Sequence, residues 1–388
     1  MDAAASSALG WLCAGVTTLL GVTVLRRAHR SPLGKAKVLL WSLLAALLCV
    51  APLGAAGGLL GVLVAVCLAR SVCPGDSELL PVAGRAVLIT GSDTGIGHAL
   101  AKYLDSLGFV VFAGVLNKDG PGAEELRRSC SQRLSVLQLD ITDTTQVKEA
   151  YLRVSEKVQN AGLWGVVNNA GILGFPADGE LLPMSTYRHC MEVNFFGAVE
   201  VSKTFLPLLR KSRGRLVNMS SMAGGIPLPR YAAYGASKAA LSMFSGVMRQ
   251  ELSKWGIKVT AIHPSGFRTG IEGTAEQWDK QEKELMENLP ADTRQAYGEE
   301  YLLGLRNYLL HLPSHCAPDL SPVLGAVLQA LLARRPQGLY TPGKGAYIPL
   351  CIFCCFPLWF YDFFISRMLS AGSVPRELRA SGDEGKNL

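Results

Sequence analysis

Three residues near the middle of the chain could together exchange a proton with an alcohol. Tyr234 and Lys238 are four residues apart, so a helix would place both side chains on one face. The positive charge of Lys238 would favour the phenolate, whose ordinary pKa is about 10. Ser221 precedes Tyr234 and could hydrogen-bond the substrate oxygen. A helical tyrosine is more often a packing residue, but this set predicts that all three are catalytic and that Ser221 and Tyr234 also bind substrate.

A glycine-rich turn precedes these residues. Residues 87–97 read VLITGSDTGIG, an apolar run that opens into glycines and then into a helical pattern. Backbone N–H groups at such a turn can hold a pyrophosphate. An ordinary turn between a strand and a helix can look the same, so the motif gains its weight from the polar residues later in the chain. It predicts cofactor contacts at Gly91, Ser92, Gly95, Ile96 and Gly97.

Polar residues end two further apolar runs. Asp140 follows the third candidate strand, and Asn168-Asn169-Ala170-Gly171 follows the fourth. The carboxyl ends of parallel strands form the ligand crevice of an open α/β sheet, so these groups should converge with the glycine turn. A dinucleotide held beside Tyr234 indicates hydride transfer to or from a nicotinamide.

The elements that must position these residues form a regular alternation. Apolar runs of strand length alternate with amphipathic stretches of helix length from about residue 80 onward. We expect strands at residues 86–90, 110–115, 134–139, 165–168, 215–220 and 258–262. This pattern predicts an α/β fold, a doubly wound parallel sheet of Rossmann type with helices on both faces.

The predicted catalytic domain spans residues 80–345 and includes a substrate segment at 267–312. Apolar side chains punctuate the polar helical pattern of that segment: Phe267, Trp278, Met286, Leu289 and Tyr297. Such a stripe is usually core packing. It also fits a lid over a flat, apolar alcohol.

Two apolar blocks predict a membrane anchor over residues 1–79. Residues 9–25 are followed by Arg26-Arg27, which fits an uncleaved anchor better than a signal peptide. Residues 38–69 are too long for one straight span of a hydrocarbon core about 30 Å thick, and their central Pro and Gly fit a break or a hairpin. Whether this block crosses or re-enters decides on which side of the membrane the catalytic domain lies, and the sequence leaves both open.

The last predicted region, residues 346–388, combines an apolar segment and a polar tail. Residues 347–369 are rich in Phe, Cys and Ile but are interrupted by Pro, Asp and Arg. This favours an interfacial segment in contact with membrane lipid, with a further membrane span as the alternative.

Composition excludes two other classes of function. The net charge is +7, but Lys and Arg are dispersed or lie beside apolar blocks, so we expect no nucleic-acid partner. The 10 cysteines have no framework spacing and lie mostly in apolar stretches, so we expect reduced thiols. Cys351, Cys354 and Cys355 lack a second Cys or His pair, and we expect no metal site.

The motifs, in this order, resemble the classical short-chain dehydrogenase/reductase family over residues 82–270. The resemblance implies that Ser221, Tyr234 and Lys238 form a catalytic triad. Asn194 in MEVNFFG would be the fourth catalytic residue, holding a water that relays protons to the lysine. The resemblance also implies cofactor contacts at Asp140, Ile141, Asn168, Ala170, Gly171, Tyr234, Lys238, Pro264, Gly266 and Thr269. Ser265 departs from the usual Pro-Gly turn, which puts the backbone contact there in doubt.

Several phrases resemble the membrane-bound branch of that family, which oxidises steroids and retinoids. They include FAGVLNKDGPGAEELRR, GLWGVVNNAGILGFPADGELL and YTPGKGAY. This implies oxidation of the 17-beta-hydroxyl of steroids, of estradiol to estrone and of testosterone to androstenedione, in the endoplasmic reticulum membrane. Retinol or an 11-beta-hydroxysteroid is the alternative substrate, and a catalytically silent, nucleotide-binding membrane scaffold is the alternative without catalysis. The family also implies a homodimer paired through the helices that bear Asn194 and Tyr234.

The residues near the glycine turn and the family resemblance together favour NAD as the cofactor. NADP needs a cation near its 2′-phosphate, whereas Asp93 in the turn would repel a phosphate if it pointed there. The carboxylate that usually selects NAD after the second strand is missing, since that region reads Val115-Leu116-Asn117. Lys118 could bind a phosphate, but a solvated loop lysine is the simpler interpretation.

Overall fold

One parallel sheet of seven strands forms the centre of the part of the chain that the structure describes. The structure, a computed structural model, describes residues 78–379 apart from 83, 272, 274, 312–313, 315, 344–346 and 370–374. The strands are β1 (Ala86–Ile89), β2 (Val110–Val115), β3 (Leu134–Gln138), β4 (Gly165–Asn168), β5 (Arg215–Met219), β6 (Lys258–Ile262) and β7 (Leu339–Tyr340). Their order is β3-β2-β1-β4-β5-β6-β7, and every pair is parallel. The predicted doubly wound sheet is confirmed, with β1, β3 and β5 each one residue shorter than expected.

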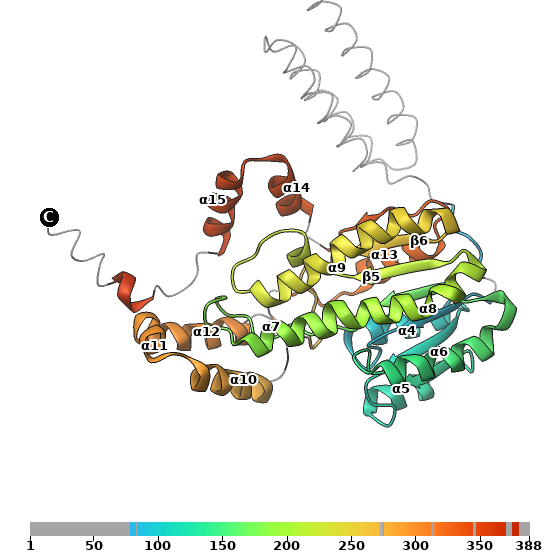
Figure 1. Cartoon of the computed structure of the whole chain (residues 1–388), viewed down its shortest axis with the longest axis horizontal. Coiled ribbons are helices and arrows are strands. Elements are labelled where there is room, and N and C mark those ends of the chain that lie inside the picture. Colours follow the sequence, from blue (N-terminus) through green and yellow to red (C-terminus); the bar gives the residue numbers. More distant parts are fainter. Residues whose placement is uncertain are drawn as a thin grey trace, which may run out of the picture. The chain divides into compact units, whose positions relative to one another are not determined.

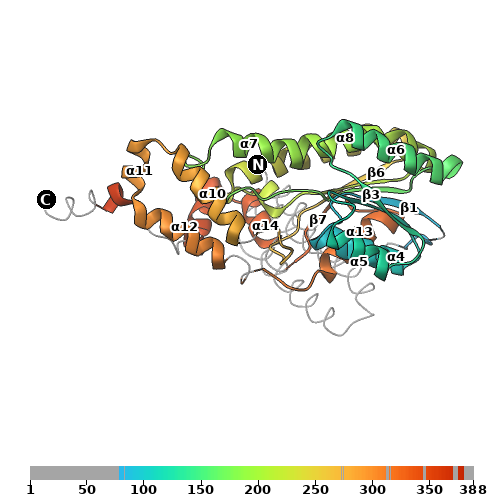
Figure 2. The ribbon, with the colours of Figure 1, turned by 90° about the horizontal axis from the view of Figure 1, so that it is seen from below.

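Helices cover both faces of this sheet (Figures 1 and 2). The helices between the strands are α4 (Gly95–Ser106), α5 (Pro121–Ser129), α6 (Thr144–Val158), α7 (Met184–Met191), α8 (Ala198–Ser212) and α9 (Ala232–Glu251). The later helices are α10 (Ala275–Asn288), α11 (Ala291–Tyr297), α12 (Glu299–His311), α13 (Ser321–Leu332), α14 (Tyr347–Cys355) and α15 (Leu358–Leu369). A π-helical turn, η3 (Glu192–Gly197), joins α7 to α8.

The central strands are apolar throughout because both faces of the sheet are covered. Val87 and Ile89 of β1 lie in a hydrophobic core with α4, α5 and α13. Ala86 and Leu88 lie in a second core with α6 and α8, and Figure 2 shows these two helix layers on opposite sides of the sheet. Successive side chains of a strand point to opposite faces, so the continuous apolar runs follow from the two layers. The strand order reverses between β1 and β4, which places a ligand crevice at their carboxyl ends.

A buried polar network joins the two central strands to the helices above them. Asn168 Nδ2 donates to Ser202 Oγ and to Asn218 Oδ1, both at 2.8 Å. Asn218 Nδ2 donates to Ser245 Oγ at 2.7 Å. A buried polar group left without a partner costs about 1–3 kcal/mol, so this network favours one register of β4 and β5 under α8 and α9.

Two arginines stack against one tryptophan at the amino ends of β1, β4 and β5. The guanidinium carbons of Arg85 and Arg215 lie 3.5 Å and 4.8 Å from the Trp164 ring centroid. The Trp164 indole N–H donates to the backbone oxygen of Leu331 at 3.0 Å. Burial, with the charge of Arg85, lowers the pKa of Arg215 to about 10. The aromatic face therefore accommodates two cations at the end of the sheet away from the crevice.

Near the C-terminus, α14 and α15 form a helical hairpin. Tyr361 of α15 is 1% exposed, packs edge-on against Phe353 of α14 at 5.0 Å and donates its hydroxyl to the Pro227 oxygen at 2.6 Å. No helix among the described residues has the length and apolarity to cross a membrane. The predicted anchor over 1–79 lies outside the described residues except for its last two, and so does the tail beyond residue 379.

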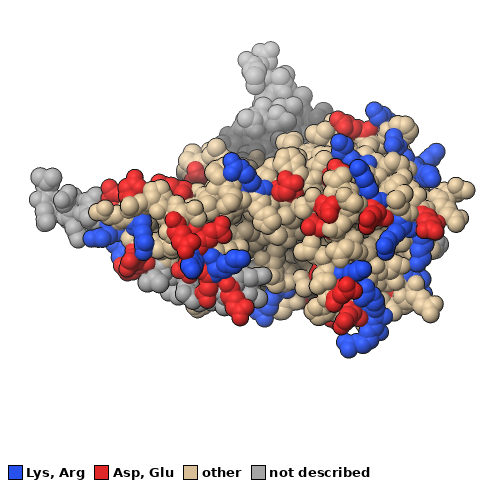
Figure 3. All heavy atoms as spheres, turned by 60° about the horizontal axis from the view of Figure 1, so that its bottom comes forward, with Lys and Arg blue, Asp and Glu red and all other residues tan. Residues whose placement is uncertain are grey.

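Acidic and basic side chains interleave on the described surface that Figure 3 presents. On that face the described residues form no continuous basic stripe of the kind that follows a nucleic-acid backbone.

Candidate active site

The structure brings the three predicted catalytic residues together. Ser221 lies two residues after β5, and Tyr234 and Lys238 lie in the first two turns of α9. The Ser221 hydroxyl is hydrogen-bonded to the Tyr234 phenol, and Lys238 Nζ lies 5.9 Å from the Tyr234 ring centroid. Ser221 has extended backbone and caps the short helix η4 (Met222–Gly224) by accepting from Ala223 N at 3.2 Å. The end of β5 and the start of α9 therefore determine the geometry of the set.

Burial sets the ionisation of this group. It raises the pKa of Tyr234 to about 12, although the Ser221 hydrogen bond lowers it. It lowers the pKa of Lys238 to about 8. A tyrosine that acts as a base near pH 7 needs a lowered pKa, and the protein alone does not supply it. The cost of desolvating the phenolate outweighs the neighbouring groups that favour it.

Sequence reasoning missed a buried thiol beside the catalytic group. Cys190 of α7 is fully buried, and its charge would act on both Tyr234 and Lys238. Burial raises the pKa of the Cys190 thiol to about 11, so the thiol is neutral near pH 7. In sequence it looks like any apolar helix residue, and no signal there marks it.

Asn194 is buried in the π-helical turn and links the catalytic helix to the loop after β4. Its Oδ1 accepts from Ile172 N at 2.8 Å, and its Nδ2 donates to Ile172 O and to Ser237 Oγ, both at 2.9 Å. Ser237 in turn donates to the Tyr234 carbonyl at 2.7 Å. Lys238 Nζ donates to a backbone oxygen, that of Met219, at 3.0 Å. The structure thus gives Asn194 a role in orientation, and the water relay stays a prediction.

Two loops close on the glycine turn, and one of them carries the NNAG motif that the sequence expects there. Gly91 has a φ of +66°, and a Cβ there would lie 2.7 Å from the Ala170 Cα atom. Gly95 has a φ of +58°, and a Cβ there would lie 2.8 Å from the Thr269 carbonyl oxygen. These positions need glycine both for their conformation and for the close approach of a second backbone. A narrow turn at the start of a helix, whose first N–H groups have no partner within the helix, fits a dinucleotide pyrophosphate.

Asn169, which the site prediction omitted, holds that turn. Its Nδ2 donates to the carbonyl oxygens of Thr90 and Gly91, both at 3.0 Å. By contrast, Asn168 uses its amide nitrogen for the core network. The predicted contact of Asn168 with the cofactor would therefore use its other atoms. The NNAG motif marked the right segment, but the sequence could not tell which asparagine turns towards the crevice.

Four further predicted cofactor residues have internal contacts. Asp140 accepts from the backbone N–H of the residue two positions later at 2.9 Å. Ser92 is fully buried and donates its hydroxyl to the carbonyl of Ile89 at 3.1 Å. Ile141 is buried in the core beneath α6 and α8, and Ile96 packs partly against the opposite core. All four lie at the carboxyl ends of β1 and β3 or at the start of α4.

The Pro264 loop lies between the serine turn and the glycine turn. The Pro264 carbonyl accepts from Met222 N at 3.0 Å, and Thr269 reaches Gly95. The Gly266 carbonyl accepts from Ala317 N at 3.0 Å. This loop therefore contacts both the serine turn and the glycine turn, and its contact with the cofactor stays a prediction.

Asp93 does turn towards the end of β2. Its Oδ1 and Oδ2 each lie 2.9 Å from Leu116 N, and Oδ1 accepts from Asn117 N at 3.2 Å. A carboxylate thus occupies the position after β2 where sequence reasoning found none. The glycine turn supplies it, rather than the strand end.

The predicted substrate segment packs on the loop after NNAG. Trp278 of α10 lies edge-on to Phe175 at 5.6 Å. Tyr297 donates to Glu180 at 2.9 Å. Met286 and Leu289 pack against the same cluster. It also contains four residues of the predicted segment that the sequence did not single out, and one residue before that segment: Leu285, Tyr301, Leu302, Leu305 and Leu181. Phe267 differs, because it lies in the core of the sheet and forms an isolated bridge with Ala317.

Comparison with known proteins gives concordant matches. Residues 85–280 match the family described as short chain dehydrogenase. The chain is 53% identical over 375 residues to 17-beta-hydroxysteroid dehydrogenase type 2 from Homo sapiens, with 95% of each chain covered. It is 46% identical over 303 residues to 11-beta-hydroxysteroid dehydrogenase type 2 from Bos taurus, with 78% of this chain and 75% of that one covered. A solved short-chain dehydrogenase from Streptomyces avermitilis has a similar fold, with a TM-score of 0.55 and 21% identity over 78% of this chain and 97% of that one.

Proposed function

The chain belongs to the short-chain dehydrogenase/reductase family of oxidoreductases, and on that premise we propose that it oxidises the 17-beta-hydroxyl group of steroids with NAD. Estradiol and testosterone are the proposed substrates, and estrone and androstenedione the products. The observation that carries the proposal is the 53% identity to the human 17-beta enzyme across 95% of both chains. The match to the 11-beta enzyme is weaker and covers 78% of this chain.

The arrangement of the side chains supports this chemistry. Ser221 orients the substrate oxygen, since its hydroxyl already lies at the Tyr234 phenol. Tyr234 takes the hydroxyl proton, and the Lys238 ammonium stabilises the phenolate that forms. NAD, when bound, supplies a hydride acceptor and a positive charge that further favours the phenolate. Loss of a proton and a hydride converts the secondary alcohol to a ketone.

The apolar cluster between α10, α12 and the 172–182 loop supports a flat, apolar substrate. Phe175, Trp278 and Leu302 are buried members of this cluster. Pockets for such ligands are lined mainly by aliphatic and aromatic side chains.

The test of the proposed function is the initial rate of estradiol oxidation by a membrane preparation. We expect estrone formation with NAD to exceed that with NADP, and to exceed oxidation of retinol or cortisol by about tenfold in kcat/KM, which is about 1.4 kcal/mol in the transition state. Faster turnover of retinol or cortisol would reassign the substrate. An absence of turnover of all three alcohols, with the dinucleotide still bound, would favour the scaffold instead.

Cofactor selectivity should depend on the charge of Asp93. Asp93→Asn keeps an oxygen that can accept from Leu116 N and removes the negative charge. We expect kcat/KM for NADP to rise about tenfold, since nearby like charges at a protein surface repel by about 1.4 kcal/mol or more. The measurement is kcat/KM for both dinucleotides. Asp119→Asn, in the next exposed loop, is the matched control, and an equal gain there would remove Asp93 from the account of selectivity.

The proposal also places the chain in the endoplasmic reticulum membrane, in contact with lipid. The hairpin α14–α15 exposes four large apolar side chains: Phe356, Leu358, Trp359 and Phe363. Aromatic residues of this kind favour the interface between lipid and water, and the apolar blocks of the sequence support an anchor. Co-fractionation with endoplasmic reticulum markers that survives a carbonate wash is the expected result.

A homodimer is the proposed assembly. Phe196 of η3 and Met243 and Val247 of α9 are exposed, on the helices through which the family resemblance implies pairing. Sedimentation of the detergent-solubilised chain measures the mass that decides between monomer and dimer.

A further inference from the structure

A hydrogen-bonded cluster lies behind the catalytic lysine. Ser220 Oγ donates to the Lys238 carbonyl at 2.9 Å, and Ser242 Oγ donates to the same carbonyl at 2.8 Å. The two serine oxygens are 2.8 Å apart. His263 Nε2 lies 2.9 Å from Ser242 Oγ. We call Ser220, Ser242 and His263 the Ser–Ser–His cluster.

The Ser242 hydroxyl connects the histidine to the lysine carbonyl. It lies within hydrogen-bond distance of both Lys238 O and His263 Nε2, and the tautomer of the ring decides which atom of the His263 pair donates. His263 Nδ1 is buried and has no partner among the described residues. Burial lowers the pKa of His263 to about 4, so the ring is neutral near pH 7. The cluster therefore carries no net charge behind Lys238.

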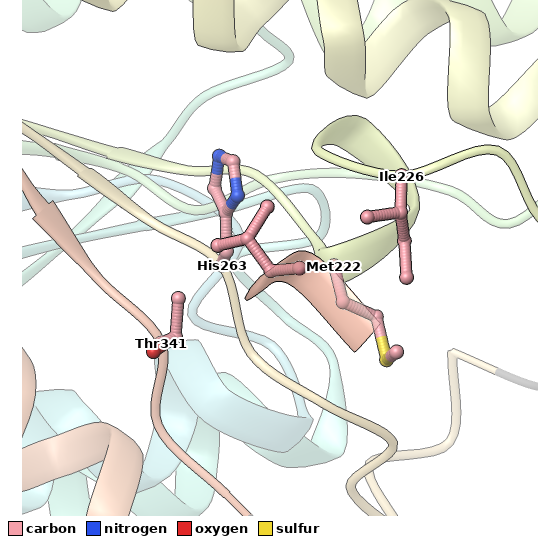
Figure 4. Close-up of a pocket in the computed structure, with 5 residues that line it drawn as sticks. Met222, Ile226, His263 and Thr341 are labelled. Carbon is pink, nitrogen blue, oxygen red and sulfur yellow. The ribbon is translucent and has the colours of Figure 1, made fainter. Parts of the chain in front are cut away.

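The turn after Ser221 rests directly on this cluster. A Cβ on Gly224 would lie 2.5 Å from Ser220 Oγ and 2.7 Å from the Lys238 carbonyl oxygen. A Cβ on Gly225 would lie 2.9 Å from His263 Nδ1. His263 also lines a small cavity together with Met222, Ile226 and Thr341 (Figure 4).

Each member of the cluster is next to a residue of the active site or one helical turn from it. Ser220 immediately precedes Ser221, and His263 immediately precedes Pro264. Ser242 is one turn beyond Lys238 on α9. The cluster therefore joins the end of β5, the end of β6 and the catalytic helix at one carbonyl group, that of Lys238.

We propose that Ser220, Ser242 and His263 are positioning residues that fix the backbone of Lys238 relative to Ser221 and the Pro264 loop. The proposal deepens the proposed function, because it explains what keeps the Lys238 ammonium at its distance from the Tyr234 phenol. The attraction between an ammonium and a phenolate falls with distance. A lysine released from this position would stabilise the phenolate less, and the base would then act only at higher pH.

Ser242→Ala is the variant that tests the proposal. We expect kcat to fall about tenfold with KM for NAD and for the alcohol changed less than about twofold, which is the signature of an interaction made in the transition state. The pKa seen in the pH profile of kcat should rise by about one unit. Ser242→Thr, which restores the hydroxyl, should recover most of both losses.

Ser245→Ala is the matched control. Ser245 is one turn further along α9, is 3% exposed and accepts from Asn218 in the core network. Its loss should lower the unfolding temperature about as much as Ser242→Ala does, but leave the pH profile of kcat in place. A shared loss of stability with an unchanged pH profile in both variants would reduce the cluster to a structural role and overturn the proposal.

The outcome can be separated from that of the proposed substrate. Wild type and variants are measured with whichever of estradiol, retinol and cortisol the wild type oxidises fastest, because Lys238 acts on any alcohol. If the wild type oxidises retinol or cortisol faster than estradiol, the proposed substrate is wrong. The role of the Ser–Ser–His cluster is then tested with the faster alcohol. If Ser242→Ala does not fold, His263→Gln is measured instead, and an unshifted pH profile in that variant contradicts the proposal equally.

Discussion

Tyr234→Phe is expected to lower kcat for alcohol oxidation about 10³-fold, within the range that general acid–base catalysis contributes. The phenylalanine ring fills the same buried space but has no proton to exchange. The neighbouring Cys190 thiol cannot take over this role near pH 7, because burial raises its pKa to about 11. The Lys238 amine, whose pKa burial lowers to about 8, is still mostly protonated at that pH. Steady-state rates near pH 7 with saturating NAD measure the loss.

Tyr231→Phe is the matched control for that experiment. The Tyr231 ring lies 6.3 Å from the Tyr234 ring, measured between centroids, and the residue immediately precedes α9. We expect its kcat to stay within about threefold of wild type, since a surface-side change in packing without loss of the base costs well under 1.4 kcal/mol. Both variants should still bind NAD, as measured by the rise in unfolding temperature that NAD causes. Comparable rates for wild type and Tyr234→Phe would refute the assigned base.

Trp164→Ala is expected to destabilise the folded chain by about 3 kcal/mol, the lower end of the cost of removing a large aromatic side chain from a core, because Trp164 is partly buried against the core of the sheet. The change removes the surface on which Arg85 and Arg215 stack and leaves two like charges beside a cavity. The apparent unfolding temperature of the solubilised chain should fall by at least about 6 °C.

A second tryptophan offers the control. Trp255 also carries an arginine, Arg210, with the guanidinium carbon 5.1 Å from the ring centroid, but Trp255 is 48% exposed. Trp255→Ala should cost less than about 1 kcal/mol, as exposed cation–π pairs do. Equal losses of unfolding free energy in the two variants would mean that arginine stacking alone explains the effect at Trp164. The greater burial of Trp164 and its second cation would then contribute little.

The sheet could be predicted because its signals are local. Each of the first six strands is a short apolar run bounded by a turn. The runs are nearly unbroken by polar residues where helices bury both faces of the strand. β7 was missed because it is only two residues long, Leu339–Tyr340, and neither residue is buried. Its place in the sheet comes from pairing with β6, a contact that no periodicity records.

The candidate site could be predicted as a set of motifs but not in its orientations. The order of Ser221, Tyr234 and Lys238 along the chain was enough to expect that they meet. The direction of the Asp93 carboxylate depends on the backbone of the next strand, which is remote in sequence. The same holds for Asn168 and Asn169, adjacent residues of one type whose side chains have different partners.

The tyrosine pKa shows a different limit. Charge alone suggested a phenol easily deprotonated beside Lys238. Desolvation, which depends on complete burial, acts in the opposite direction and is larger in the protein alone. A spacing of four residues carries no information about that burial.

The hydrogen bond from the Tyr361 hydroxyl to the Pro227 carbonyl attaches the α14–α15 hairpin to the loop between Ser221 and Tyr234. The residues that match the family end at 280, and Ser221, Tyr234 and Lys238 all lie before that point. A chain shortened before α14 would retain the complete chemical set and lose the support under the turn after Ser221. A shortened chain that keeps its activity should therefore extend through α15, beyond the residues that match the family.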